Sequence, residues 1–260
     1  MSPFFDTDEP FSSWSIEGLY GAPAIFFEET ESTHLYLRHH FKELVPGTLI
    51  VANSQSAGRG RHERSWVSPI DKNLYFNLII SLKNIPERYY SQITQVTAIS
   101  LAQVLRQIEI NVAVKWPNDL LWHRQKIGGI ISERLIHNGE NFLSLGVGLN
   151  VNADATDFEN LGRPATSLKL ICKKPLHRAY LLQMIVKKIG EALLVLEKEG
   201  VRPWIEEWRK MDNFLGEKGK IVEFDKIISG TIHNINDDGS LSFQKESGEI
   251  ITVYAGDLEI

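Results

Sequence analysis

An Asn-Gly pair at Asn138-Gly139 limits, more than any other feature, how this chain can fold. It separates two apolar stretches of strand composition, residues 127–134 and 142–151, and an Asn-Gly pair in that position is typical of a tight β-hairpin. In a doubly wound parallel sheet, helices join the neighbouring strands, so a hairpin argues against that architecture. The sequence therefore predicts an α+β fold in which a mixed β-sheet packs against helices.

The spacing of apolar residues predicts the other elements. After Phe214 the pattern changes to short, closely spaced strands separated by Asp237-Asp238-Gly239 and Ser247-Gly248, which indicates a small β-barrel. We therefore expect a lead-in at residues 1–23, a main domain at 24–212 and a barrel at 214–260. The expected strands are 24–28, 48–53, 74–82, 112–116, 120–122, 220–224, 228–235, 241–245 and 250–254, and the expected helices are 34–44, 91–110, 176–199 and 203–211.

Composition excludes several classes of protein. The 260 residues include one cysteine, Cys172, which rules out an internal disulfide and a multi-cysteine zinc site. No apolar run has the length of a membrane-spanning helix, and the N-terminus lacks the features of a signal peptide. A net charge of −5 argues against a general nucleic-acid binder, which usually has a basic excess. We expect a cytoplasmic protein without DNA or membrane partners and without a metal site made of protein ligands alone.

A polar loop, 54–69, contains the run Gly58-Arg59-Gly60-Arg61, followed by Arg64 and Trp66. Glycines allow the backbone to approach a ligand and to expose its N–H groups, and arginines supply permanent positive charge with forked donors. The loop is therefore suited to binding phosphate and carboxylate groups. Taken alone, it could equally be a solvated basic loop or an RNA-contacting segment.

Three further segments could carry chemistry. Lys115-Trp116-Pro117-Asn118-Asp119 ends an apolar strand, Lys126-Ile127-Gly128-Gly129 begins another, and small residues alternate over 146–152. Each has a structural alternative: a capped turn for the first, and a β-bulge with an exposed lysine for the second. The third is a lone Gly-x-Gly without the dinucleotide fingerprint, and the chain has no Walker A loop, so ATP would need another binding scheme.

In combination and in this order, these segments resemble the biotin–protein ligase family. The resemblance covers about residues 24–212, with Ala165-Thr166-Ser167-Leu168 as a further matching stretch. It implies a mixed sheet like that of class II aminoacyl-tRNA synthetases, followed by a C-terminal SH3-like β-barrel at 214–260. It also implies two reaction steps: biotin and ATP form biotinyl-5′-AMP, and the biotinyl group then passes to a lysine of a carboxyl carrier protein.

The resemblance also implies residue roles. Arg61 and Lys126 would be catalytic, because the two reactants are anions whose mutual repulsion must be neutralised. Asp119 is the candidate base for the acceptor lysine, whose reference pKa of about 10.4 requires it to lose a proton before it attacks. Asn118 and Asp119 would contact the nucleotide or its magnesium. The expected contacts of biotin and its adenylate are Ser32, Thr33, His34, Gln55, Gly58, Arg59, Gly60, Arg61, Trp66, Lys126, Gly128, Gly129, Gly148 and Asn150.

One residue departs from the family pattern, which often has Asn after Ser-Thr where this chain has His34. An imidazole can also donate or accept a hydrogen bond, so we expect biotin binding to persist with a changed ring contact.

The expected partners are biotin, ATP with Mg²⁺, and a biotin carboxyl carrier protein such as the subunit of acetyl-CoA carboxylase. A homodimer could form through the appendage or a sheet edge. The short stretch before residue 24 leads us to expect a ligase without repressor function. A lipoate or octanoate ligase is the alternative enzyme, and a nucleic-acid-binding module is the alternative from another class.

Overall fold

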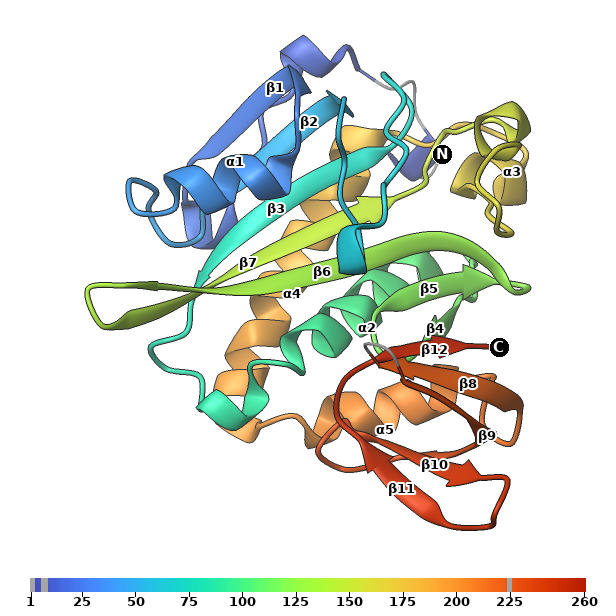
Figure 1. The fold of residues 1–260 in the computed structure, drawn as a ribbon. Helices are drawn as coiled ribbons and strands as arrows, with labels where there is room; N and C mark the ends of the chain where they lie inside the picture. Colours follow the sequence, from blue (N-terminus) through green and yellow to red (C-terminus); the bar gives the residue numbers. More distant parts are fainter. Residues whose placement is uncertain (1–2, 6–8, 224–225) are drawn as a thin grey trace.

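The computed structural model describes residues 3–5, 9–223 and 226–260, and a seven-stranded sheet lies at its centre (Figure 1). The strands β1 and β2 pair in parallel and the other neighbours pair antiparallel, which confirms the predicted mixed sheet. In spatial order the strands are β1 (Ala24–Thr30), β2 (Leu49–Gln55), β3 (Leu74–Ser81), β7 (Glu140–Leu149), β6 (Gln125–His137), β5 (Asp119–Trp122) and β4 (Ala113–Lys115).

The predicted hairpin joins β6 to β7. Asn138 and Gly139 both have positive φ, 51° and 78°, as a type I′ turn requires. The register continues from His137 opposite Glu140 to Gly128 opposite Leu149. The hairpin therefore places Lys126 and the small residues of β7 on adjacent strands at the same end of the sheet.

Helices cover both faces of the sheet (Figure 1). On one face, α1 (Thr33–His40) contributes to a small cluster with Ile50 and Ile79. On the other face, Leu49, Val51, Leu78 and Ile80 join the main core, so alternate residues of β2 and β3 pack on opposite sides. The helices of this second layer are α2 (Ile93–Arg106), α4 (Arg178–Glu199) and α5 (Arg202–Met211).

The expected helices 34–44 and 91–110 end earlier in the structure. α2 stops at Arg106, and Glu109 has a φ of 61°, although Ile108 and Ile110 remain buried in the main core. Apolar spacing predicts burial, and burial continues after the helical hydrogen bonds end. No helix among the described residues has the length and apolar composition that crossing a membrane requires.

The described part of the lead-in packs into the main core. Phe4, Phe11, Trp14, Ile16 and Leu19 are buried there, although the sequence showed no regular period in this region. The reason is that the helical turns among its described residues are the short 3₁₀ turns η1 (Pro3–Phe5), η2 (Phe11–Ser13) and η3 (Leu19–Gly21). The domain boundaries at 23 and 212 stay predictions.

A second sheet follows α5. It is antiparallel, and Trp116 Nε1 and Gln95 Nε2 attach it to the main layer by donating to Gly239 O at 3.1 and 2.7 Å. Its predicted strands are confirmed, except that Phe224 lies outside the described residues, and closure into a barrel stays a prediction. In spatial order the strands are β11 (Ile250–Val253), β10 (Leu241–Lys245), β9 (Lys226–Ile235), β8 (Lys218–Glu223) and β12 (Asp257–Glu259).

The strand β12 was not predicted, because three residues carry too little periodic signal. Its pairing with β8 brings Asp257 opposite Val222. At the two edges of the seven-stranded sheet, β1 and β4 have one neighbour each within the described part of the chain; dimerisation through such an edge stays a prediction.

Candidate active site

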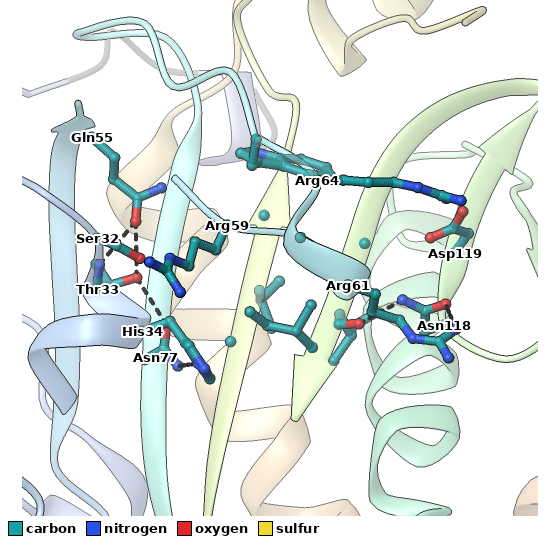
Figure 2. Close-up of a pocket in the computed structure, with 18 of the residues that line it drawn as sticks. Ser32, Thr33, His34, Gln55, Arg59, Arg61, Arg64, Asn77, Asn118 and Asp119 are labelled. Carbon is teal, nitrogen blue, oxygen red and sulfur yellow. Dashed lines mark hydrogen bonds between the residues drawn. The ribbon is translucent and has the colours of Figure 1, made fainter. Parts of the chain in front are cut away.

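A cavity opens on the α1 face of the sheet, above β3, β7 and β6 (Figure 2). It encloses about 640 Å³ including its mouth. The floor is low because Gly146 pairs with Asn77 of β3, and Gly148 pairs with Gly129 of β6. The alternating small residues therefore leave room on one face of β7, as the sequence predicted.

The Gly-Arg loop forms the roof of this cavity. It folds back on itself through a bridge between Arg59 and Ser65 and a hydrogen bond from Trp66 N to Gly58 O of 2.8 Å. A Cβ on Gly58 would lie 2.5 Å from Trp66 O, and one on Gly148 would lie 2.4 Å from Trp66 Cε2. The first glycine makes the turn possible, and the second lets the indole ring rest on the floor.

One end of the cavity, the neutral end, is lined by uncharged hydroxyl and amide groups, and the guanidinium of the roof residue Arg59 lies beside them (Figure 2). Thr33 N donates to Gln55 Oε1 at 2.9 Å, and Thr33 Oγ1 donates to Asn77 Oδ1 at 2.8 Å. Ser32 Oγ is buried and has no hydrogen-bond partner among the described residues. Because a buried polar atom without a partner is costly, Ser32 is prepared to bind a polar ligand.

The opposite end is cationic. Lys126 Nζ lies 2.6 Å from Asp119 Oδ1, and Arg61 Nη1 donates to Asn118 Oδ1 at 3.3 Å. Burial lowers the pKa of Lys126 below its ordinary value, and the charge of Asp119 opposes that shift. The predicted β-bulge is present between β5 and β6, but Lys126 is not exposed: its side chain is only 16% accessible.

Asp257 of the C-terminal sheet completes the cationic end. Its carboxylate lies 2.9 Å from Arg61 Nη1 and 2.9 Å from Arg64 Nη2, and Gly256 O accepts from both terminal nitrogens of Arg61 at 3.1 Å. The roof is thus fastened to a different sheet. No local pattern around Asp257 indicates this contact, so the sequence analysis missed it.

A second cavity adjoins the first and shares Trp66, Lys126 and Arg163 with it. Phe158 and Leu161 give it an apolar wall, and Asn150 also lines it. Asn150 Nδ2 donates to Thr166 O at 3.1 Å. A planar group of moderate polarity would fit between these side chains.

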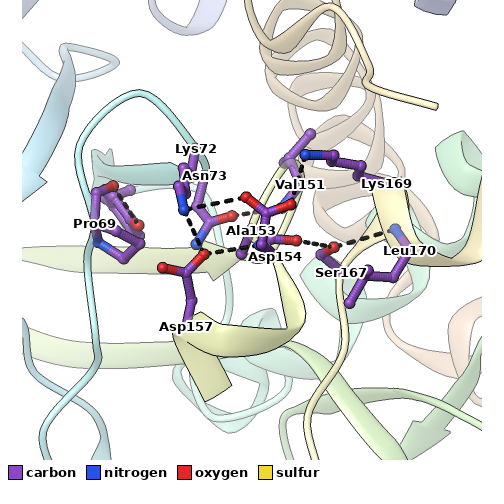
Figure 3. Close-up of polar contacts among 11 residues, drawn as sticks. Pro69, Lys72, Asn73, Val151, Ala153, Asp154, Asp157, Ser167, Lys169 and Leu170 are labelled. Atoms are coloured by element: carbon purple, nitrogen blue, oxygen red, sulfur yellow. Dashed lines mark hydrogen bonds and ion pairs between the residues drawn. The ribbon is translucent and has the colours of Figure 1, made fainter. Parts of the chain in front are cut away.

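Ion pairs hold the segment that carries this apolar wall (Figure 3). Lys72 Nζ lies 2.7 Å from Asp157 Oδ2 and 3.2 Å from Asp154 Oδ2, and Lys169 Nζ lies 2.6 Å from Asp154 Oδ1. Asp154 and Asp157 also form a capping box around η6 (Ala155–Phe158). The base of the segment is thereby fixed to the turn before β3 and to α3 (Leu168–Cys172).

The structure brings most of the predicted site residues together. Asn150 lines the second cavity, whereas Gly58 and Gly128 line neither cavity and support the residues that do. The sequence analysis missed Asn77, Arg64, Arg163 and Asp257 as lining residues of the first cavity. The predicted residues that line it are Ser32, Thr33, His34, Gln55, Arg59, Gly60, Arg61, Trp66, Asn118, Asp119, Lys126, Gly129 and Gly148.

Comparisons with known proteins agree with this arrangement. The model of the biotin/lipoate A/B protein ligase family matches residues 26–152. The bifunctional ligase/repressor BirA of Escherichia coli is 32% identical over 218 residues, which cover 83% of this chain and 67% of that protein. The biotin–[acetyl-CoA-carboxylase] ligase of Mycobacterium tuberculosis is 24% identical over 226 residues, which cover 82% of this chain and 79% of that protein.

Comparison of the fold with solved structures also points to the biotin protein ligases. The solved structure of the biotin protein ligase from Aquifex aeolicus in complex with biotin and ATP has a TM-score of 0.80 and 27% identity with this chain, and it covers 91% of this chain and 97% of its own. The matched residues 26–152 include the Gly-Arg loop and both lysine-containing segments that carried the resemblance. The chain therefore belongs to the biotin/lipoate A/B protein ligase family, and the relatives that it matches there include biotin protein ligases.

Proposed function

We propose that this protein is an ATP-dependent biotin–protein ligase. The observation that carries the proposal is a single cavity with a neutral hydrogen-bonding end and a cationic end. Biotin has the complementary shape: a neutral ureido ring with two N–H groups and one carbonyl, an aliphatic chain, and a terminal carboxylate. Ser32, Thr33 and Gln55 suit the ureido ring, and the lining residue Ile131, which lies beside Gly146 on the cavity face of the sheet, suits the chain.

The cationic end suits the first chemical step. A carboxylate oxygen of biotin attacks the α-phosphate of ATP, a mixed anhydride forms, and the bond to pyrophosphate breaks. Arg61 and Lys126 would hold the two anions together and stabilise the charge that develops on the phosphate. Sheltered hydrogen bonds to charged groups contribute about 1.5–3 kcal/mol each.

We assign the adenine base to the second cavity. Trp66 and Phe158 supply apolar surface for a planar ring, and the cavity meets the first one at Lys126, where the α-phosphate would lie. This placement accounts for two adjoining cavities that share a roof residue. It also explains why the ion pairs of Lys72 matter, since they hold the wall that carries Phe158.

Magnesium would arrive with the nucleotide. Among the described residues, no cluster of three or more His, Cys, Asp or Glu side chains could hold a metal by itself. Mg²⁺ commonly binds to one or two carboxylates together with substrate phosphates. Asp119, whose second carboxylate oxygen lies 3.9 Å from Lys115 Nζ, is near the expected phosphates and is the residue that would hold the ion, whose charge would offset that of the phosphates.

In the second step, a lysine amine of a carboxyl carrier protein attacks the carbonyl of the anhydride, and AMP leaves. The amine must first lose a proton, and Asp119 is the proposed acceptor for it. Its carboxylate already contacts Lys126 at 2.6 Å and Lys115 at 3.9 Å. We therefore propose that it also positions Lys126 during the first step.

The test is pyrophosphate release from ATP in the presence of biotin or of lipoate. The dithiolane ring of lipoate would leave the buried polar groups of the neutral end unpaired, and sites built for hydrogen bonding reject such analogues by about 10⁴–10⁵-fold. We expect release with biotin and almost none with lipoate, followed by biotin transfer to a carboxyl carrier domain. Equal release with both acids would contradict the proposal and favour a lipoate ligase.

A further inference from the structure

His34 connects the neutral end of the cavity to a charged group beneath it. Its Nδ1 atom lies 3.2 Å from Ser144 Oγ and 3.5 Å from Asn77 Nδ2, and its Nε2 atom lies 3.0 Å from Glu133 Oε2. Asn77 in turn accepts the hydrogen bond from Thr33 Oγ1. A continuous chain of polar contacts therefore joins Glu133 to the hydroxyl group that faces the ligand.

The partners fix the direction of these hydrogen bonds. Asn77 Nδ2, beside His34 Nδ1, can only donate, and the carboxylate of Glu133, beside Nε2, is negatively charged. The neutral ring therefore carries its proton on Nε2 and accepts at Nδ1 from Ser144. Ser144 then accepts from Asn77 Nδ2, at 3.0 Å, which leaves Asn77 Oδ1 to accept from Thr33. Asn77 Oδ1, at 2.8 Å, is closer to Thr33 Oγ1 than the other acceptor, Gln55 Oε1 at 3.2 Å. With its proton directed to Asn77, Thr33 Oγ1 presents lone pairs to the cavity, where an N–H group can donate to them.

Protonation of His34 would reverse this direction. Nδ1 would become a donor to Ser144, whose own proton would turn toward Asn77. The Asn77 amide would flip, and Thr33 would accept from its Nδ2 and direct its proton away from Asn77. Asn77 would then occupy one of the two lone pairs of Thr33 Oγ1, so the hydroxyl would be a weaker acceptor for an N–H group of the ligand.

Burial favours the neutral ring of His34, and the charges around it act in both directions. Those that face it are Glu133 of β6, Arg38 of α1 and Arg59 of the roof. Burial is the largest influence and lowers the pKa of His34, Glu133 raises it, and the two arginines lower it. Glu133 Oε2 lies 3.0 Å from Nε2 but has no hydrogen bond among the described residues, so it acts on the ring through its charge.

We propose that His34 is a positioning residue for biotin recognition: its neutral ring orients the hydroxyl of Thr33 to accept a ureido N–H, and protonation of the ring weakens biotin binding. This inference rests on the proposed function. It concerns the ureido ring only, so it leaves the affinity for ATP and the rate of the chemical step unchanged.

Calorimetric titration of the intact protein between pH 5 and pH 8.5 tests the inference. The probe is biotinol, in which a hydroxymethyl group replaces the carboxyl group, so that the ligand itself does not titrate. Below the lowered pKa of His34 we expect the Kd to rise about tenfold, the loss of about 1.4 kcal/mol. The KM for biotin should rise in parallel, while kcat and the KM for ATP should not follow this transition.

Three variants separate this role from a structural one. In His34→Asn, the amide oxygen can accept from Ser144 where Nδ1 did, and it does not titrate, so biotinol should bind with a pH-independent Kd. Glu133→Gln should move the transition to lower pH, because the anion that supports His34⁺ is removed. Arg38→Gln should move it to higher pH, and this side chain is half exposed, so its replacement leaves the core intact.

The outcomes are distinguishable. Absence of biotinol binding at every pH would overturn the proposed function itself. Binding with a pH-independent Kd in the unmodified protein would overturn the inference about His34 alone. A transition that persists in His34→Asn, or that does not move in opposite directions in Glu133→Gln and Arg38→Gln, would also overturn it. If His34→Asn does not fold, the last comparison still decides the matter, since both variants retain the histidine.

Discussion

Gly148 offers a direct test of how the roof closes on the floor of the site. A methyl group added at Gly148 would lie 2.4, 2.7 and 2.7 Å from Cε2, Cζ2 and Nε1 of Trp66. Ordinary contact begins at 3.4 Å, so in Gly148→Ala either the indole or the strand must move by roughly 1 Å, the kind of overpacking that costs about 1–3 kcal/mol.

The structure indicates that the roof will move and the strand will not. Gly148 lies on β7, between β3 and β6, and is paired with Tyr75 and Gly129. Trp66 lies in a loop whose backbone is held by fewer hydrogen bonds. If displacement of the indole costs about 1–3 kcal/mol in the closed state, biotin binding and adenylate retention should weaken roughly 5- to 150-fold. The melting temperature should change little.

Biotin affinity by calorimetry, biotin-dependent pyrophosphate release and the melting temperature are the measurements. The matched control is Gly190→Ala on α4, where a Cβ would lie 3.5 Å from Leu19 Cδ2 and Tyr20 Cε1, an ordinary contact. Alanine is the better helix former there, so stability should be equal or higher and activity unchanged. If Gly148→Ala binds biotin within twofold of the unmodified protein, the indole does not seal the cavity and the reasoning fails.

Three further predictions concern the cationic end. Lys126→Ala should abolish adenylate formation while the protein stays folded, because the charge that holds the carboxylate and phosphate is lost; retained turnover would remove Lys126 from the site. Since burial lowers the pKa of Lys126, its charge and the adenylation rate should fall as pH rises toward the ordinary lysine value of 10.5, and any activity retained by Lys126→Arg should lack this alkaline decline. Arg61→Gly and Asp257→Asn should both release biotinyl-5′-AMP faster, the first by losing the contact and the second by unfastening the roof. A leak rate unchanged in Asp257→Asn would show that the C-terminal sheet does not hold the roof.

Sequence patterns predicted the main sheet well because its determinants are local. The apolar run of β3 and the Asn138-Gly139 turn are each set by a few neighbouring residues, so both can be recognised without knowledge of the fold. Helix ends were less accurate, because residues such as Ile108 and Ile110 are buried without being helical. The burial of the lead-in was not predicted for a related reason: Phe11 and Trp14 are buried as single residues, without a regular apolar spacing.

Within the site, the glycines and the charged residues could be selected from the sequence, but their partners could not. Only the resemblance combined the Gly-Arg loop with the lysine segments, since each had an equally plausible structural explanation. The role of Asn77 in the site could not be predicted for another reason. A lone polar residue inside a buried strand gives no indication of which face of the sheet it occupies or which group it binds.

The sequence by itself determined the local rules: where the chain turns, which strands alternate, and where the absence of a side chain leaves room over β7. Only the tertiary structure decided which polar and charged groups contact one another. Arg61 contacts Gly256 across 195 residues, and Thr33 reaches Asn77 across 44. Such contacts form because packing of the sheet and helices brings distant segments together, and no local pattern encodes the distance between them.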